Sequence, residues 1–242
     1  MNTNVNLAAP VGALALLGTG LVFFLAAVFL IESLIVRKRT RAKVIFVAMA
    51  GLCALYLLAM AIFSVSSHEK LLARGEEKHF CELDCHLAYS VIDARRTRTI
   101  GEGANQLTAK GSYLLVTIKT RFDETTIAPW RGNGQLTPDD RALTLIDQNG
   151  NRYAPVRESG SALTTPLRPG ESYTTEVAFD VSTETSNPIL LINESDWITH
   201  LVIGHENSPL HKQAKFRIDL PAIAFSRSQH IFAMWQTTLP SS

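Results

Sequence analysis

Two long apolar segments near the N-terminus dominate the hydrophobic pattern of the chain. Residues 11–36 carry one charged side chain, Glu32, and residues 44–66 carry none. A helix needs about 20 apolar residues to cross a hydrocarbon core of about 30 Å. We therefore predict two transmembrane helices, at 11–36 and 44–66. Glu32 lies about one turn from the basic segment that follows, where its carboxylate can pair with Arg37 or Arg39.

Residues 37–43 form a short basic loop between these segments. Five of the seven residues are Lys or Arg, whereas residues 1–10 carry no charged side chain. Because short cytoplasmic loops are enriched in Lys and Arg, we predict a multi-pass protein of the inner (cytoplasmic) membrane with both termini on the extracytoplasmic side. A cleavable signal peptide is not predicted, since it needs a basic n-region and a shorter apolar stretch.

From residue 88 onward the hydrophobic period changes to that of β-strands. Short apolar or alternating segments are separated by clusters rich in Gly, Pro, Asn and Asp. The segments are LAYSVIDARR, SYLLVTIKTRF, RALTLIDQNG, SYTTEVAFDV, PILLIN, ITHLVIG and AKFRIDL. We therefore predict an all-β, immunoglobulin-like antiparallel sandwich over residues 88–220. Residues 67–87 are then a juxtamembrane connector, and residues 221–242 are a C-terminal tail.

Two turns carry the residue types that their backbone geometry requires. Asn149 and Gly150 suit the φ > 0 positions of a two-residue hairpin. This hairpin would place Leu145 and Tyr153 on paired strands. In PLRPGESY, the Pro fixes φ before the Gly of a second turn.

The order of these motifs resembles a family of bacterial extracytoplasmic domains of unknown function. The motifs are YLLVTIKTRFDETT, then D-x-x-G-x-x-Y in LTLIDQNGNRYAP, then L-x-P-G-E before the apolar strands of EVAFDVS and PILLI. The resemblance implies an immunoglobulin-like fold similar to that of a mycobacterial immunoprotective antigen, tethered by a lipoprotein anchor or a membrane helix. It covers about residues 88–220 and implies little about activity, because sandwiches host many unrelated functions.

The densest group of reactive side chains is HFCELDCH, residues 79–86. Cys81 and Cys85 would lie outside the cytoplasm, where paired thiols oxidise. A disulfide needs Cβ atoms about 3.5–4.5 Å apart. Residues four apart in a helix or a strand are further apart than that. A Cys81–Cys85 disulfide therefore requires a tight irregular loop.

Three other hypotheses for this segment stay open. Two thiolates with the imidazoles of His79 and His86 form a soft ligand set that suits copper. The spacing C-x-x-x-C-H is one residue longer than the motif that attaches haem c, with His86 as the proximal ligand. The segment can also be a connector without a special role. His205 and His211 flank the polar turn ENSP and would contribute to a metal site if that turn adjoined the first strand.

The charge balance and the absence of known catalytic motifs limit the possible function classes. The chain has 23 basic and 22 acidic side chains, and its basic stretch ARRTRT alternates along a strand, which is typical of a solvated face. Nucleic acid is therefore not an expected partner. No nucleophile elbow, H-E-x-x-H or phosphate loop is present in the sequence, so we predict no catalytic residues, and whether the chain is an enzyme stays open.

The leading hypothesis is a membrane-anchored extracytoplasmic module with a non-enzymatic binding or accessory role in the cell envelope. Its expected partners are membrane lipids and an envelope protein. The alternative is a copper-binding or electron-transfer protein that uses the cluster of Cys81, Cys85 and His86. A c-type haem protein is the third hypothesis.

Overall fold

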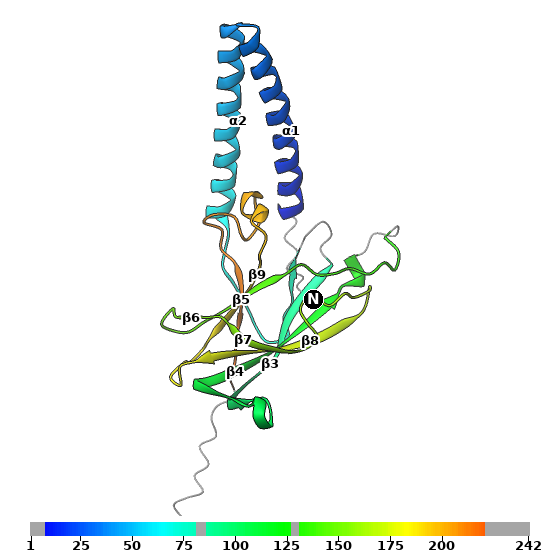
Figure 1. The fold of residues 1–242 in the computed structure, drawn as a ribbon, viewed down its shortest axis with the longest axis vertical. Helices are drawn as coiled ribbons and strands as arrows, with labels where there is room; N and C mark the ends of the chain where they lie inside the picture. The colour runs from blue at the N-terminus through cyan, green and yellow to red at the C-terminus, as the bar shows by residue number, and fades with distance from the viewer. Residues whose placement is uncertain (1–7, 81–85, 127–130, 221–242) are drawn as a thin grey trace, which may run out of the picture.

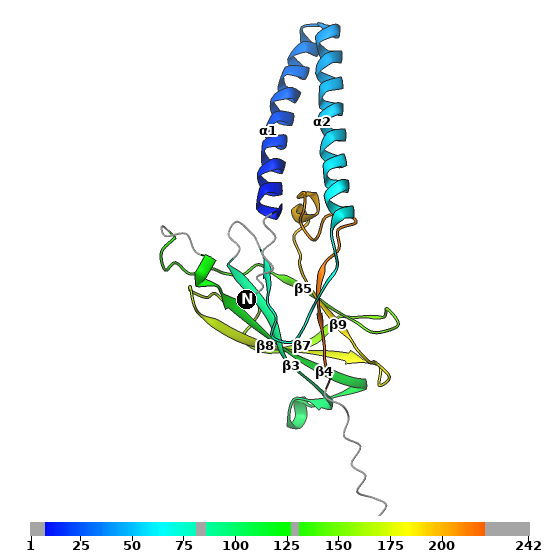
Figure 2. The same ribbon diagram turned by 180° about the vertical axis from the view of Figure 1, so that it is seen from behind.

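A computed structural model of the chain describes residues 8–80, 86–126 and 131–220. Two long helices, α1 (Ala8–Ile35) and α2 (Arg39–Ser66), form a hairpin, and a β-sandwich follows (Figures 1 and 2). This arrangement confirms the predicted fold class of two apolar helices followed by a two-sheet β-sandwich. Both helices are long and apolar enough to cross a membrane.

The turn of the helical hairpin is tighter than the basic loop that we predicted. α1 ends at Ile35 and α2 begins at Arg39, so several of the basic residues lie in the first turns of α2. Glu32 pairs with Arg41, at 3.8 Å from Oε1 to Nη1, and not with either arginine that we predicted. Glu32 pairs with Arg41 because the two residues lie at similar distances from the turn, on opposite helices.

The strands form two five-stranded sheets. The first sheet has the order β1-β10-β9-β5-β6, with β1 (Lys70–Leu72), β10 (Ala214–Arg217), β9 (Ile189–Glu194), β5 (Arg141–Ile146) and β6 (Arg152–Tyr153). The second has the order β2-β3-β4-β8-β7, with β2 (Lys78–Phe80), β3 (Leu87–Ile100), β4 (Leu107–Phe122), β8 (Ser172–Val181) and β7 (Pro155–Gly160). Among the described residues, three short 3-10 helices lie in connections: η1 (Gly103–Asn105), η2 (Glu124–Thr126) and η3 (Ile198–Leu201).

Two parts of the sandwich differ from the sequence prediction. Residues 67–87, which we predicted as a connector, contain β1 and β2, while the predicted strand ITHLVIG forms η3 and turns. β1 pairs with β10 in parallel, whereas the other pairs of named strands are antiparallel. The parallel pair arises because both strands start beside the end of α2, where Lys212 N donates a hydrogen bond to Ser67 Oγ at 2.8 Å.

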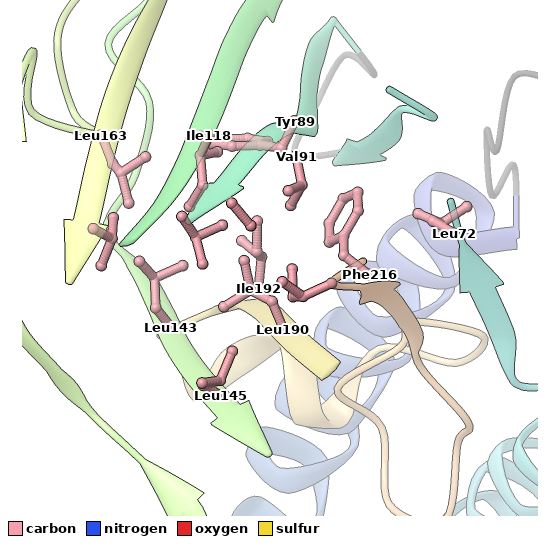
Figure 3. Packing of buried hydrophobic residues seen from close by; sticks show 14 of the residues in the cluster. Leu72, Tyr89, Val91, Ile118, Leu143, Leu145, Leu163, Leu190, Ile192 and Phe216 are labelled. Atoms are coloured by element: carbon pink, nitrogen blue, oxygen red, sulfur yellow. The ribbon is translucent and has the colours of Figure 1, made fainter. Parts of the chain in front are cut away.

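The hydrophobic core lies between the two sheets. Figure 3 shows Tyr89, Ile118, Leu190, Ile192 and Phe216 converging there from four strands, β3, β4, β9 and β10, and each is fully buried. Burial of an aliphatic or aromatic side chain of this size stabilises a fold by about 1.5–3 kcal/mol. The core thus belongs to the sandwich, whereas most large apolar side chains of α1 and α2 are exposed.

The Asn-Gly hairpin has the predicted register. Leu145 pairs with Tyr153, as we expected from the sequence, but the turn is longer than the two-residue hairpin that we predicted, since Ile146 and Arg152 form its last pair. Only Gly150 of the Asn-Gly pair adopts a positive φ, of 82°, which a side chain would disfavour. Asp147 holds the turn, since its Oδ1 accepts a hydrogen bond from Asn149 N at 2.8 Å and its Oδ2 accepts one from Tyr153 Oη at 3.0 Å. One side chain therefore stabilises both the turn and the strand that follows it.

Candidate functional site

The segment between β9 and β10, residues 195–213, contacts both helices, and we call it the β9–β10 loop. Tyr56 Oη of α2 donates a hydrogen bond to Leu201 O at 2.7 Å. On α1, a Cβ atom built on Gly12 would lie 1.9 Å from Ile203 O, so only glycine permits this approach. In both ribbon views η3 lies between the two helix ends that face the sandwich (Figures 1 and 2).

Behind this loop, a buried lysine joins the two sheets. Lys78 of β2 is 3% exposed, and its Nζ lies 2.7 Å from Glu206 Oε1. The same ammonium donates hydrogen bonds to Ile192 O at 2.6 Å and Ala214 O at 3.2 Å on the opposite sheet. Burial lowers the pKa of Lys78, and the Glu206 carboxylate opposes this effect. The ammonium thereby ties β2 to β9, β10 and the β9–β10 loop.

A second buried group lies in the same region. Glu194 Oε2 accepts a hydrogen bond from His205 Nε2 at 2.9 Å, and Glu194 Oε1 lies 3.7 Å from Arg141 Nη1. His205 Nδ1 accepts a hydrogen bond from Asn207 N at 3.1 Å, which matches the neutral tautomer with its proton on Nε2. The Arg141 guanidinium lies over the ring of Phe80, 4.4 Å from its centroid. These residues form a polar interior beneath the β9–β10 loop.

A third charged group lies on the outer face of the second sheet. Glu77 accepts two hydrogen bonds from Arg121, both at 2.8 Å, and these bonds lower the pKa of Glu77. Burial alone would raise the pKa of Asp123, but hydrogen bonds from Thr125 and Arg121 outweigh it and lower that pKa. His79 Nε2 lies 3.5 Å from Glu77 Oε2. This group is a paired ionic network, with Arg121 at its centre.

The predicted cysteine ligands, Cys81 and Cys85, lie outside the described residues. The flanking strands are described, and Phe80 pairs with Leu87 across β2 and β3. Paired positions on adjacent strands have Cα atoms about 4.5–5.5 Å apart, so the end of β2 and the start of β3 lie close together. The disulfide, copper and haem hypotheses stay predictions.

The structure places the four predicted histidine ligands in different surroundings. His79 and His86 flank the β2–β3 connection, and the ring of His86 stacks on Phe122 with 5.5 Å between centroids. His205 uses both ring nitrogens in the hydrogen bonds given above, and His211 Nδ1 lies 2.8 Å from Lys212 O. The turn with His205 does adjoin β2, but successive side chains of a strand point to opposite faces, so His79 and Lys78 diverge. Within the described ranges, no three His, Cys, Asp or Glu side chains are grouped as a metal site requires.

The outer face of the second sheet also holds a groove of about 440 Å³. Arg95 and Glu176 pair across it at 2.8 Å, and the buried side chains of Ile100, Leu115 and Ala178 form an apolar cluster below them. The full lining is Arg95, Thr99, Ile100, Gly101, Glu102, Leu115, Arg157, Ser159, Glu176 and Ala178. The groove therefore combines an apolar floor with charged side chains of both signs.

Sequence reasoning missed the buried charges and the groove. Lys78 lies in GEEKHF, whose composition is typical of a solvated connector. The sequence around its partner Glu206 gives no indication of the pair. The β9–β10 loop did give a signal, because Ile198 and Leu201 belong to the apolar run ITHLVIG. We interpreted that run as a strand, although its apolar side chains are partly exposed beside the helices.

Comparisons with known proteins give structural similarity alone. No protein-family model and no curated protein matches the chain in sequence. A secreted protein from Mycobacterium tuberculosis, MPT63, is 14% identical, with a TM-score of 0.41 over 63% of this chain and 99% of its own. An uncharacterized β-sandwich protein from Clostridium difficile is 10% identical, with a TM-score of 0.39 over 64% and 97%. The yjhA protein from Bacillus subtilis is 14% identical, with a TM-score of 0.39 over 63% and 100%.

Proposed function

We propose that the protein is an integral membrane module that presents its β-sandwich at the extracytoplasmic surface to a protein partner in the cell envelope. The observation that carries this proposal is the direct attachment of the sandwich to two apolar helices. Only residues 67–69 separate α2 from β1, and the β9–β10 loop contacts both helices. A sandwich attached in this way has a fixed position above the membrane, which suits a supporting role better than a flexible tether would.

The orientation follows from the basic turn of the helical hairpin. Its Lys and Arg residues lie at the end of the hairpin opposite the sandwich (Figure 1). Because positive charges favour the cytoplasmic side, the sandwich belongs on the other side. The groove of the second sheet is the surface that we assign to the partner, since its charged side chains of both signs can pair with complementary charges of a protein.

The orientation predicts opposite results for two reporter fusions. Alkaline phosphatase, which is active only outside the cytoplasm, will be active when fused after Ser242 and inactive when fused after Lys43. A fluorescent protein that folds only in the cytoplasm will give the reverse pattern. Equal phosphatase activity of the two fusions, or activity confined to the Lys43 fusion, would contradict the proposed topology.

The partner role predicts site-specific crosslinking from the groove. A photo-crosslinking residue at Ser159 in the full-length chain will give one discrete adduct in intact cells. The same residue at Ala142, an exposed position of β5 on the other sheet, will not. Arg157→Glu will reduce the adduct because it reverses a charge on the groove, whereas Arg152→Glu on β6 will leave the yield unchanged. Adducts of equal yield from Ser159 and Ala142 would show that the groove is not the partner surface.

A further inference from the structure

The β9–β10 loop exposes large apolar side chains in a sandwich that buries most of the others. Trp197 is 69% exposed, Ile198 45%, Leu201 42% and Leu210 77%. Single exposed apolar residues are ordinary, but a group of this size in one loop marks an interaction surface. The presence of tryptophan favours a membrane surface as the partner of this group, since Trp is enriched where proteins meet the membrane–water interface.

The position of the loop along the helices is the second observation. Leu201 O accepts a hydrogen bond from Tyr56 Oη, and Tyr56 lies ten residues before Ser66, or about 15 Å along α2 at about 1.5 Å per residue. Ile203 lies against Gly12, near the start of the apolar run of α1. Residues 198–203 therefore lie at the height of the apolar helix surfaces. A bilayer that covers those surfaces also reaches the loop.

The hydrogen bonding of the loop suits an environment without water. Three backbone N–H groups of its apolar part have partners within the loop: Ile198 N with Asp196 Oδ1 at 3.0 Å, His200 N with Trp197 O at 3.2 Å, and Val202 N with Thr199 O at 3.3 Å. The Leu201 carbonyl is satisfied by Tyr56. Irregular backbone is tolerated at membrane depth only where its polar groups are satisfied by the protein. These contacts meet that condition for the backbone groups that make them.

Leu210 gives a third observation. It adopts a φ of 66°, a left-handed conformation that residues with a branched, bulky side chain seldom take. Such strain is retained where the surrounding structure needs it. The residue in this conformation has an exposed apolar side chain and lies two residues before Lys212, whose N–H is bonded to Ser67 at the end of α2.

We infer that the β9–β10 loop inserts Trp197, Ile198 and Leu201 into the boundary between headgroups and acyl chains of the outer leaflet, with Leu210 at its edge. This inference rests on the proposed insertion of α1 and α2. The lipid contact adds to the attachment of the sandwich, so that the sheet bearing the groove keeps one orientation to the membrane. The ligand is the bilayer itself, recognised by its apolar interior next to a polar surface.

Fluorescence quenching by brominated lipids tests the inference with the full chain in liposomes. Trp130→Phe and Trp235→Phe leave Trp197 as the only tryptophan. Lipids brominated near the headgroup end of the acyl chain will quench Trp197 emission by at least about twofold, as expected for an interfacial tryptophan. Lipids brominated near the bilayer centre will quench it less.

Two control chains separate the possible outcomes. Both control chains carry Trp197→Phe in addition to Trp130→Phe and Trp235→Phe. The first has Phe24→Trp in the middle of α1. The second has Asn105→Trp in η1, which lies at the end of the sandwich remote from the helices (Figure 2). The inference expects quenching of Trp197 and of the α1 tryptophan but not of the η1 tryptophan. If only the α1 tryptophan is quenched, the loop is in water or covered by a protein and the inference is wrong, while the membrane spans stand. If neither the α1 tryptophan nor Trp197 is quenched, the inference and the proposed anchoring both fail.

Discussion

Lys78→Met will lower the free energy of unfolding of the sandwich by about 3 kcal/mol. The substitution keeps the length and apolar stem of the side chain but removes the ammonium that pairs with Glu206 at 2.7 Å. Breaking a buried ion pair by removing one partner costs about 3–5 kcal/mol, because the other charge stays buried and unpaired. We expect the lower end of this range, since the Glu206 side chain retains 16% exposure and can recruit water.

The matched control for this variant is Lys215→Met. Lys215 Nζ pairs with Glu69 at 3.0 Å, but these side chains are 23% and 49% exposed. Exposed pairs contribute about 0–1 kcal/mol, so this variant will stay within about 1 kcal/mol of the parent protein. Urea unfolding of the full chain in detergent, followed by tryptophan emission, measures both variants.

A double variant distinguishes the charge from the packing of Lys78. Glu206→Gln in the Lys78→Met background removes the unpaired carboxylate, so it will recover part of the lost stability. Equal stability of Lys78→Met and Lys215→Met would mean that the ammonium is solvated and that the two sheets are not joined by it.

A buried ion pair between residues far apart in the chain, such as Lys78 and Glu206, cannot be predicted from a single sequence. Lys78 and Glu206 are far apart along the chain, and each lies in a polar stretch that is typical of solvent-exposed loops. Burial of the pair depends on the complete topology, which brings β2 of one sheet beside β9, β10 and the loop between them. Only the folded arrangement brings them together.

The predictable elements are those with a strong local pattern. The two helices have apolar runs longer than a membrane is thick, and the Asn-Gly pair marks the position of the turn between β5 and β6, although that turn is longer than two residues. β1 and β2 have three residues each, which is too short for a period of two to be recognised. β7 is almost wholly exposed, so it carries no alternation of buried and exposed positions.

The β9–β10 loop was mispredicted for a different reason. ITHLVIG has the composition of a buried strand, but its apolar residues are directed toward the helix ends and outward, and not between the sheets. Apolar composition thus identified an apolar segment without identifying what it packs against. The two N-terminal helices supply that neighbour.

Phe216→Ala will have the other large effect, a loss of about 3–5 kcal/mol in the free energy of unfolding, as is typical of a buried phenylalanine. Phe216 is fully buried in β10. It pairs with Leu190 of β9 on one side and with Leu72 of β1 on the other, and Figure 3 shows all three side chains in the core. Truncation leaves a cavity between the strand that follows α2 and the rest of the sheet.

Leu71→Ala is the control for this cavity, because Leu71 lies next to Leu72 in β1 but is 46% exposed. Surface substitutions usually change stability by about 0.5 kcal/mol or less, so this variant will unfold close to the parent midpoint in urea. A loss below about 1 kcal/mol for Phe216→Ala would mean that β10 relaxes into the cavity. Because β1 connects the sandwich to α2, the same relaxation would weaken the fixed attachment of the sandwich on which the proposed function depends.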